Sequence, residues 1–210
     1  MIEKLKLEIN EKLKKQTVSS RVLLDRLTLV DEFSRKSLQY QDSKYLPFYY
    51  YLSKFLPSKS LFHIGFDLAL PSCCFIKGSD YIERILGFRR QKEKEEFYSP
   101  RLAISNLKNS KSKSKKLEID FYQGNIIDRF LTEKLSRKFD LIIITEDEPD
   151  YIIREYLDVC WEHMNPNGFL VLDYLNTSNK LNLMFENFCK SKSRNYGIFE
   201  TRYKTGIVEK

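Results

Sequence analysis

The chain has 210 residues, of which 42% are hydrophobic, and its formal net charge at pH 7 is +7. This length accommodates one α/β domain with a sizeable core and a short extra segment, but not two ordinary domains. The apolar content excludes a disordered chain, and no apolar run approaches the roughly 20 residues of a membrane span. We therefore expect a globular protein that does not contact a membrane.

The first ten residues, MIEKLKLEIN, alternate charged and apolar side chains and lack the unbroken apolar stretch of a secretory signal. We expect the protein to stay in the cytoplasm. Its four cysteines show no CxxC spacing, and each lies in an apolar stretch. This pattern favours buried free thiols over disulfides or a zinc site.

Residues 1–57 are predicted to form a helical extension. Apolar residues recur at spacings of three and four over residues 2–15, which indicates one buried face of a helix. A second helix is expected over about 20–38. A third begins at Pro47, whose fixed φ suits a first helical turn, and ends at Pro57.

The third helix carries the aromatic segment YLPFYYY, residues 45–51. Aromatic side chains are enriched at protein interfaces, so this segment is a candidate contact for homo-oligomers. Packing inside the protein's own core is the alternative interpretation.

From residue 61 onward, short apolar runs alternate with amphipathic stretches, which is typical of βαβ units and a mostly parallel sheet. The predicted strands are residues 61–65, 84–88, 117–122, 139–145 and 168–173. The predicted helices are residues 101–108, 126–136, 151–164 and 178–192. Two terminal strands, 196–203 and 205–208, are expected to form a hairpin.

This order of elements resembles the class I S-adenosylmethionine (SAM)-dependent methyltransferase fold over residues 58–210. FDLIIIT at 139–145 resembles the fourth strand of that family, and MNPNGFLVLD at 164–173 resembles its Leu-x-Pro-Gly-Gly turn and fifth strand. Residues 101–106 and 122–125 resemble the helix after its second strand and the end of its third. The resemblance implies an α/β, Rossmann-like, mostly parallel seven-stranded sheet with a C-terminal antiparallel hairpin and helices on both faces.

In such sheets the ligand lies beyond the carboxyl ends of the strands. The resemblance places the cofactor loop after the first strand, at His63, Gly65, Phe66, Asp67 and Ala69. Only Gly65 keeps a family glycine, whereas Asp67 and Ala69 occupy two further glycine positions. His63 stands where the family has an acidic residue, and a structural role in the core is its alternative.

The resemblance assigns the end of the second strand to the ribose of SAM. Arg89 stands where a carboxylate would accept two ribose hydroxyls, and a guanidinium has only donors. Glu93, Glu95 and Glu96 follow closely and could take over this role if the strand runs longer, although a solvated charged face is the structural alternative for them. At the end of the third strand, Gln123 and Asn125 are the candidates for contact with adenine. Asn125 equally suits the cap of the next helix.

The loop after the fourth strand is strongly acidic and follows Thr145, which we include in the cofactor pocket. Glu146 and Asp147 are the candidates for deprotonating a methyl acceptor. The structural alternative is that carboxylates gather at the N-terminus of a helix to complement its dipole.

The metal-dependent catechol-type members of the family hold an ion at the ends of their fourth and fifth strands. This chain has Thr145 and Tyr174 at two of those positions, so Asp173 is the one position that matches the family's metal ligands. One carboxylate is too few for a magnesium or calcium ion, so we predict no metal site.

Two hypotheses of function follow. The first is SAM-dependent methyl transfer to a small-molecule or protein acceptor that the sequence does not identify. The alternative is a methyltransferase-like fold that does not catalyse and acts as a binding or structural protein, because both the loop glycines and the ribose carboxylate are replaced. Nucleic-acid binding ranks lowest, since the lysine-rich tract 108–116 has no interleaved aromatic residues and is typical of a solvated loop.

Overall fold

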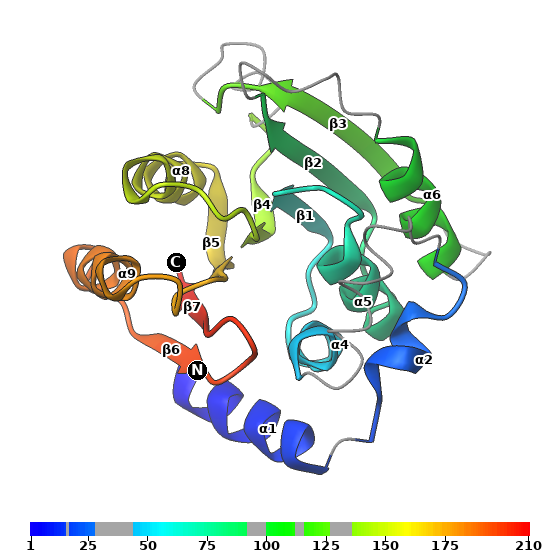
Figure 1. Cartoon of the computed structure of the whole chain (residues 1–210), viewed down its shortest axis with the longest axis horizontal. Helices are drawn as coiled ribbons and strands as arrows, with labels where there is room; N and C mark the ends of the chain where they lie inside the picture. Colours follow the sequence, from blue (N-terminus) through cyan, green and yellow to red (C-terminus); the bar gives the residue numbers. More distant parts are fainter. Residues whose placement is uncertain (16, 28–43, 92–99, 112–115, 127–135) are drawn as a thin grey trace.

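A computed structural model describes residues 1–15, 17–27, 44–91, 100–111, 116–126 and 136–210. Its centre is a seven-stranded sheet with the strand order β3-β2-β1-β4-β5-β7-β6 (Figure 1). The strands are β1 Ser60–Ile64, β2 Arg84–Arg90, β3 Glu118–Gly124, β4 Phe139–Ile144, β5 Met164–Leu172, β6 Tyr196–Phe199 and β7 Thr205–Glu209. The helices are α1 Ile2–Lys15, α2 Ser20–Leu24, α4 Tyr45–Phe55, α5 Leu70–Gly78, α6 Arg101–Ser110, α8 Asp150–Glu162 and α9 Asn179–Ser191.

Strands β1 to β5 pair in parallel, and β7 runs antiparallel to both β5 and β6. The predicted fold class is therefore confirmed, including the terminal hairpin. The order places β1 between β2 and β4, so the chain leaves β1 at the point where the strand order reverses. This is the position at which open α/β sheets bind their ligands.

The sheet has a separate hydrophobic core on each face. Figure 1 shows α4, α5 and α6 on one side of the sheet and α8 and α9 on the other. Alternate residues of each strand enter the two cores: Leu61 and Ile85 pack under α5, whereas Phe62 and Leu86 pack on the side of α8. This alternation follows from the two-residue period of a strand.

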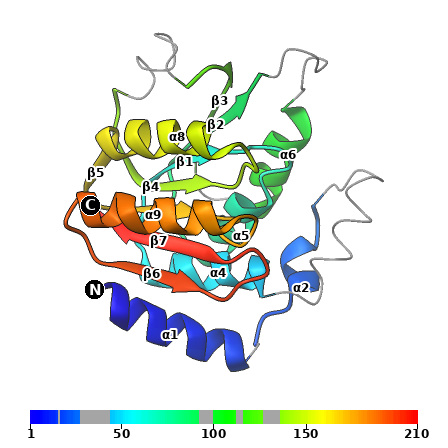
Figure 2. The same cartoon turned by 60° about the vertical axis from the view of Figure 1, so that its left-hand side comes forward.

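The N-terminal extension packs on the same core as the sheet. Helix α1 lies along β6 and contacts α4, as Figure 2 shows, and its apolar face is buried at the expected spacing. Helix α4 packs mainly against α5, and Leu46, Phe48 and Leu52 are fully buried. The aromatic segment of α4 is thus largely used inside the protein, and only Tyr50 in it is partly exposed.

Some boundaries differ from the expected ones. The cluster at 165–168, predicted as a turn before the fifth strand, belongs to β5, where the register with β4 shifts between Phe139 and Leu141. Pro166 has no N–H to donate to the ladder, which accounts for an irregular rather than a regular strand here. The hairpin strand β6 ends at Phe199, because a turn through Lys204, with φ of 50°, leads into β7.

Two predicted helices fall largely outside the described residues. Of the helix expected over 20–38, only α2 lies within the described residues. Of the helix expected at 126–136, residues 127–135 lie outside them. The four cysteines are buried free thiols, as expected. Within the described ranges, no helix is both long and apolar enough to cross a membrane.

Candidate functional site

The loop after β1 has left-handed backbone at two residues, only one of which is a glycine. Gly65 has φ of 84° and Ala69 has φ of 54°, so both lie in the left-handed region. Ala69 precedes α5 directly. Since a residue with a Cβ pays about 1 kcal/mol for this conformation, the turn at Ala69 is held by its surroundings and not by local preference.

Gly65 is required by the chain's own packing. A Cβ at this position would lie 2.8 Å from Thr145 Oγ1 and 2.9 Å from the backbone nitrogen of Glu146. The loop after β1 therefore presses directly against the end of β4. The close approach that a glycine permits is used here for a contact between two segments of the protein.

His63 lies in the core and is hydrogen-bonded at both ring nitrogens. Its Nδ1 is 2.7 Å from Ser72 Oγ, and its Nε2 is 2.9 Å from Thr145 Oγ1. The Thr145 hydroxyl donates to the carbonyls of Ile64 and Gly65, each at 3.2 Å. We therefore assign the tautomer in which Nε2 donates to Thr145 and Nδ1 accepts from Ser72.

Burial lowers the pKa of His63 to about 3. The ring is consequently neutral near pH 7, and a base of such low pKa cannot activate the Thr145 hydroxyl effectively. The chain Ser72–His63–Thr145 joins α5, β1 and β4 as a structural link. It does not form a nucleophilic site.

Phe66 points away from the ligand edge into the core. Its ring lies over Gly87 of β2, where a Cβ would come within 2.5 Å of the ring carbons, and its centroid is 5.9 Å from that of Phe121. Gly87 is therefore a residue of this region that the sequence analysis missed. A glycine inside a predicted strand is the signal that indicates such a close approach.

Arg89 and Asp67 face each other across the ligand edge. Arg89 Nη1 lies 3.6 Å from Asp67 Oδ1, and the side chains are 21% and 51% exposed, respectively. The residue at the ribose position and the residue at a glycine position of the cofactor loop thus form an ion pair. This pair ties the end of β2 to the loop after β1.

A second ion pair joins β2 to the loop after β4. Arg90 Nη1 is 3.0 Å from Glu148 Oε2, and the Glu148 side chain is only 4% exposed. Glu146 accepts a long hydrogen bond of 3.4 Å from the Tyr156 hydroxyl of α8, and Asp147 is exposed. Glu146 therefore contacts α8, and neither catalytic candidate is among the residues that line the cleft described below.

The end of β3 places the two adenine candidates differently. Gln123 pairs with Arg89 across the β2–β3 ladder, and its amide nitrogen and oxygen are buried without a hydrogen-bond partner among the described residues. Asn125 is exposed just beyond the strand. The helix that it was expected to cap lies outside the described residues.

A small cleft remains between the β1 loop, the end of β4 and helix α4. Its volume is about 50 Å³. Four predicted residues line it, namely Gly65, Asp67, Ala69 and Thr145, together with Tyr45, Leu68, Leu70, Pro71 and Tyr174. Pockets for drug-sized ligands usually measure 300–1,000 Å³, so this cleft is smaller than such a pocket.

Among the described residues of this edge, none supplies the carboxylate that the resemblance implies for the ribose of SAM. Arg89 offers donors where ribose hydroxyls need acceptors, and Asp67 forms an ion pair with Arg89. Glu93, Glu95 and Glu96, the alternative acceptors, lie outside the described residues. The described residues also contain no group of three or more His, Cys, Asp or Glu side chains placed to hold a metal ion.

Asp173 forms a polar centre that the sequence analysis did not predict. Its Oδ2 accepts hydrogen bonds from Tyr45 at 2.7 Å and Tyr49 at 2.6 Å, and its Oδ1 accepts one from Thr205 at 2.6 Å. The side chain lies at the end of β5 and is 1% exposed. Burial, opposed by these hydrogen bonds, raises its pKa to about 6.

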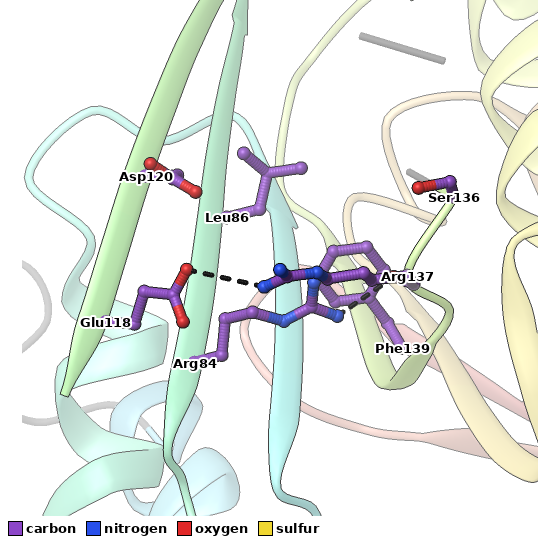
Figure 3. Close-up of a pocket in the computed structure, with 7 residues that line it drawn as sticks. All are labelled: Arg84, Leu86, Glu118, Asp120, Ser136, Arg137 and Phe139. Carbon is purple, nitrogen blue, oxygen red and sulfur yellow. Dashed lines mark hydrogen bonds and ion pairs between the residues drawn. The ribbon is translucent and has the colours of Figure 1, made fainter. Parts of the chain in front are cut away.

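A separate hollow of about 200 Å³ lies at the opposite end of the strands (Figure 3). There the Arg84 guanidinium lies 4.3 Å from the centre of the Phe139 ring and donates to the carbonyls of Arg137 and Lys138. Arg137 is 3.7 Å from Glu118. Both arginines of this hollow thus have partners within the protein. The hollow is remote from the ligand edge.

No protein-family model matches the sequence, and no curated protein matches it in sequence. Solved structures do match. A Staphylococcus aureus protein, provisionally assigned as a caffeoyl-CoA O-methyltransferase, is 15% identical with a TM-score of 0.61, and the match covers 98% of each chain.

Two further structures hold the cofactor or its product. The Streptomyces achromogenes O-methyltransferase TomG, in complex with SAM, is 10% identical over 95% of each chain, with a TM-score of 0.60. A Bacillus cereus O-methyltransferase in complex with S-adenosylhomocysteine is 14% identical, covering 94% of this chain and 100% of that one, with a TM-score of 0.58. The chain therefore has the fold of the class I SAM-dependent methyltransferases.

Proposed function

We propose that this chain is a methyltransferase-fold protein that does not catalyse SAM-dependent methyl transfer and acts as a binding or structural protein. The Arg89–Asp67 ion pair carries the proposal, because it joins the two positions that should face the cofactor. Losing one acceptor would weaken a cofactor site. Here both positions are changed together, and their side chains are complementary to each other.

The small volume of the cleft supports the same conclusion. Tyr45 and Tyr174 are among the residues that line it, and the Asp173 carboxylate, to which the Tyr45 hydroxyl donates, accepts hydrogen bonds from three hydroxyl groups. A larger groove of about 640 Å³ lies between α8 and α9, where Tyr151 is 70% and Leu183 is 55% exposed. Exposed apolar surface of this kind is typical of contacts with other macromolecules.

Methyl transfer to a small-molecule or protein acceptor is the competing hypothesis, and the similarity to SAM-binding O-methyltransferases favours it. Such an enzyme works chiefly by aligning acceptor, methyl group and sulfur, so it needs the cofactor firmly placed. Cofactor binding therefore separates the two hypotheses.

Isothermal titration calorimetry with SAM and with S-adenosylhomocysteine is the test. We expect no binding heat from the purified full chain at millimolar ligand, whereas the Bacillus cereus enzyme serves as the positive control. Micromolar binding of either ligand would overturn the proposal.

A further inference from the structure

The groove between α8 and α9 is much larger than the cleft at the ligand edge, about 640 Å³ against about 50 Å³. Figures 1 and 2 both show the two helices side by side as the outer layer on one face of the sheet. Apolar side chains of both helices line the groove, namely Tyr151 and Leu157 of α8 and Leu183, Met184 and Phe188 of α9. An apolar groove between two helices is a surface on which a further helix can pack.

Two large apolar side chains of this groove are mostly in solvent. They are Tyr151, the second residue of α8, and Leu183 of α9. Removing exposed apolar side chains from water favours association, and a groove beside them offers the space to receive them. Since one such side chain comes from each helix, the surface has both a projection and a hollow on either side.

The two helices carry opposite charge. Helix α8 has four carboxylates and one arginine, whereas α9 has two lysines and one glutamate. Asp150 of α8 and Lys180 of α9 both line the groove, but neither forms an ion pair with another side chain of the described chain. These two opposite charges are therefore available to a partner.

The directions of the helices decide how a second copy can meet this surface. Each helix follows one of two adjacent parallel strands, β4 and β5, so both helices begin at the carboxyl edge of the sheet. Asp150 and Lys180 consequently lie at the same end of the groove. A twofold axis parallel to the helices places the acidic α8 of one copy opposite the basic α9 of the other, with Asp150 level with Lys180 of the other copy.

This surface is thus complementary to itself in charge and in shape. The chain as a whole has a net charge of +7, so two copies repel each other in a contact between basic surfaces. A contact of α8 with α9 avoids that repulsion, because each acidic helix meets a basic one. A second copy therefore fits the groove better than it fits the rest of this basic chain.

We propose that the groove between α8 and α9 is the contact surface of a twofold-symmetric homodimer. In this dimer, Tyr151 and Leu183 of each copy enter the groove of the other, and Asp150 of each copy pairs with Lys180 of the other. The inference rests on the binding role proposed above and names a second copy of the chain as the partner.

The size of the surface predicts a weak dimer. Each helix has 13 residues and is therefore about 20 Å long, and the two helices together are about 20 Å wide. Interdigitating side chains add to this footprint, so the dimer buries about 1,000 Å² in total. This area is at the lower end of specific contacts, for which we expect a Kd of about 10 μM.

Sedimentation equilibrium of the full chain tests the dimer. Between about 1 and about 200 μM, the average mass should rise from that of one chain to that of two. The mass of a single chain at every concentration would overturn the proposal and leave the groove to a different macromolecule.

A pair of variants locates the contact. Leu183→Arg places a charge in the middle of the proposed interface, so its dimerisation should be weaker by about tenfold or more. Leu7→Arg is the matched control, because Leu7 is an exposed leucine of α1 and its substitution adds the same charge. It should dimerise like the wild type. Equal dimerisation of the two variants would place the contact elsewhere and overturn the proposal.

A charge exchange tests the arrangement of the two copies. Lys180→Asp brings two aspartates together and should weaken the dimer by about tenfold. The double variant Asp150→Lys, Lys180→Asp restores opposite charges and should recover most of that loss, whereas a double variant as weak as Lys180→Asp would refute the arrangement. These measurements contain no cofactor. A monomeric chain would therefore overturn the dimer alone, and SAM binding in calorimetry would overturn the proposed function alone.

Discussion

Arg89 and Asp67 form an ion pair of 3.6 Å across the carboxyl edge of the sheet, and so link the end of β2 to the loop that follows β1. Both residues depart from what the fold family places there, and each supplies the charge that the other needs. The pair thus attaches the loop, which has aspartate and alanine at two positions where the resemblance implies glycine, to the edge of the sheet.

The first prediction concerns the strength of this pair. A double-mutant cycle with Asp67→Asn and Arg89→Gln should give a coupling energy of about 0.5 kcal/mol, because half-exposed pairs are screened by water. Urea denaturation at low and high salt measures it. The coupling should shrink as salt rises, and a value of several kcal/mol would show that the pair is effectively buried.

The second prediction concerns Gly65. Gly65→Ala should destabilise the protein by about 2 kcal/mol or more, since the new Cβ meets Thr145 and the φ of 84° disfavours any side chain. The urea midpoint measures the loss. A change below about 0.5 kcal/mol would mean that the two loops can separate at little cost.

The third prediction is the opposite change at the other end of the same loop. Ala69→Gly relieves a left-handed residue with φ of 54°, at the expense of greater freedom in the unfolded chain. We expect stability to be unchanged or to increase by up to about 1 kcal/mol. A clear loss of stability would instead show that the Ala69 methyl group, which is buried, contributes packing that outweighs its strain.

The fourth prediction concerns His63. The folded state holds the pKa of this histidine at about 3, below its unfolded value, so the unfolded chain takes up a proton first as pH falls. Stability should therefore drop by about 3 kcal/mol from pH 7 to pH 4.5. In His63→Gln, which cannot titrate, urea denaturation at the two pH values should show a correspondingly smaller drop.

The fifth prediction concerns Asp173, for which the sign is reversed. Its pKa in the folded state is raised to about 6, so the stabilising effect of its protonation is complete below the unfolded pKa and is lost as pH rises to about 6. Relative to wild type, Asp173→Asn should therefore gain about 2 kcal/mol in stability between pH 4 and pH 7. A difference that is constant with pH would contradict the raised pKa.

The fold could be predicted because periodicity is a local property of the sequence. The alternation of apolar runs and amphipathic stretches after residue 61 was enough to indicate a parallel sheet, and the turn residues near 165–168 marked the approach to the fifth strand. The pattern missed that Pro166 and its neighbours belong to β5, where a shift of register in the ladder with β4 accommodates the extra residues.

The candidate site was predictable in position but not in its contacts. Gly65, Asp67, Ala69 and Thr145 do meet at one cleft, because the carboxyl ends of neighbouring parallel strands share an edge. The pairing of Asp67 with Arg89 depends on side-chain reach between separate loops, which spacing in the sequence does not encode.

The polar centre at Asp173 was missed for a similar reason. Tyr45 and Asp173 are 128 residues apart, and Thr205 joins them only because β7 folds back onto β5. An aromatic helix and an aspartate at a strand end each had a simpler explanation when considered separately. Only the packing of α4 against the sheet brings their polar atoms together.

Ala69 shows that a left-handed turn can form without a glycine. Its φ of 54° directly precedes α5, so the chain follows the path of a glycine turn although the sequence has alanine there. Searches that recognise this fold by its glycines will overlook chains of this kind. Counting such chains by structure instead of by motif should enlarge the known membership of the fold.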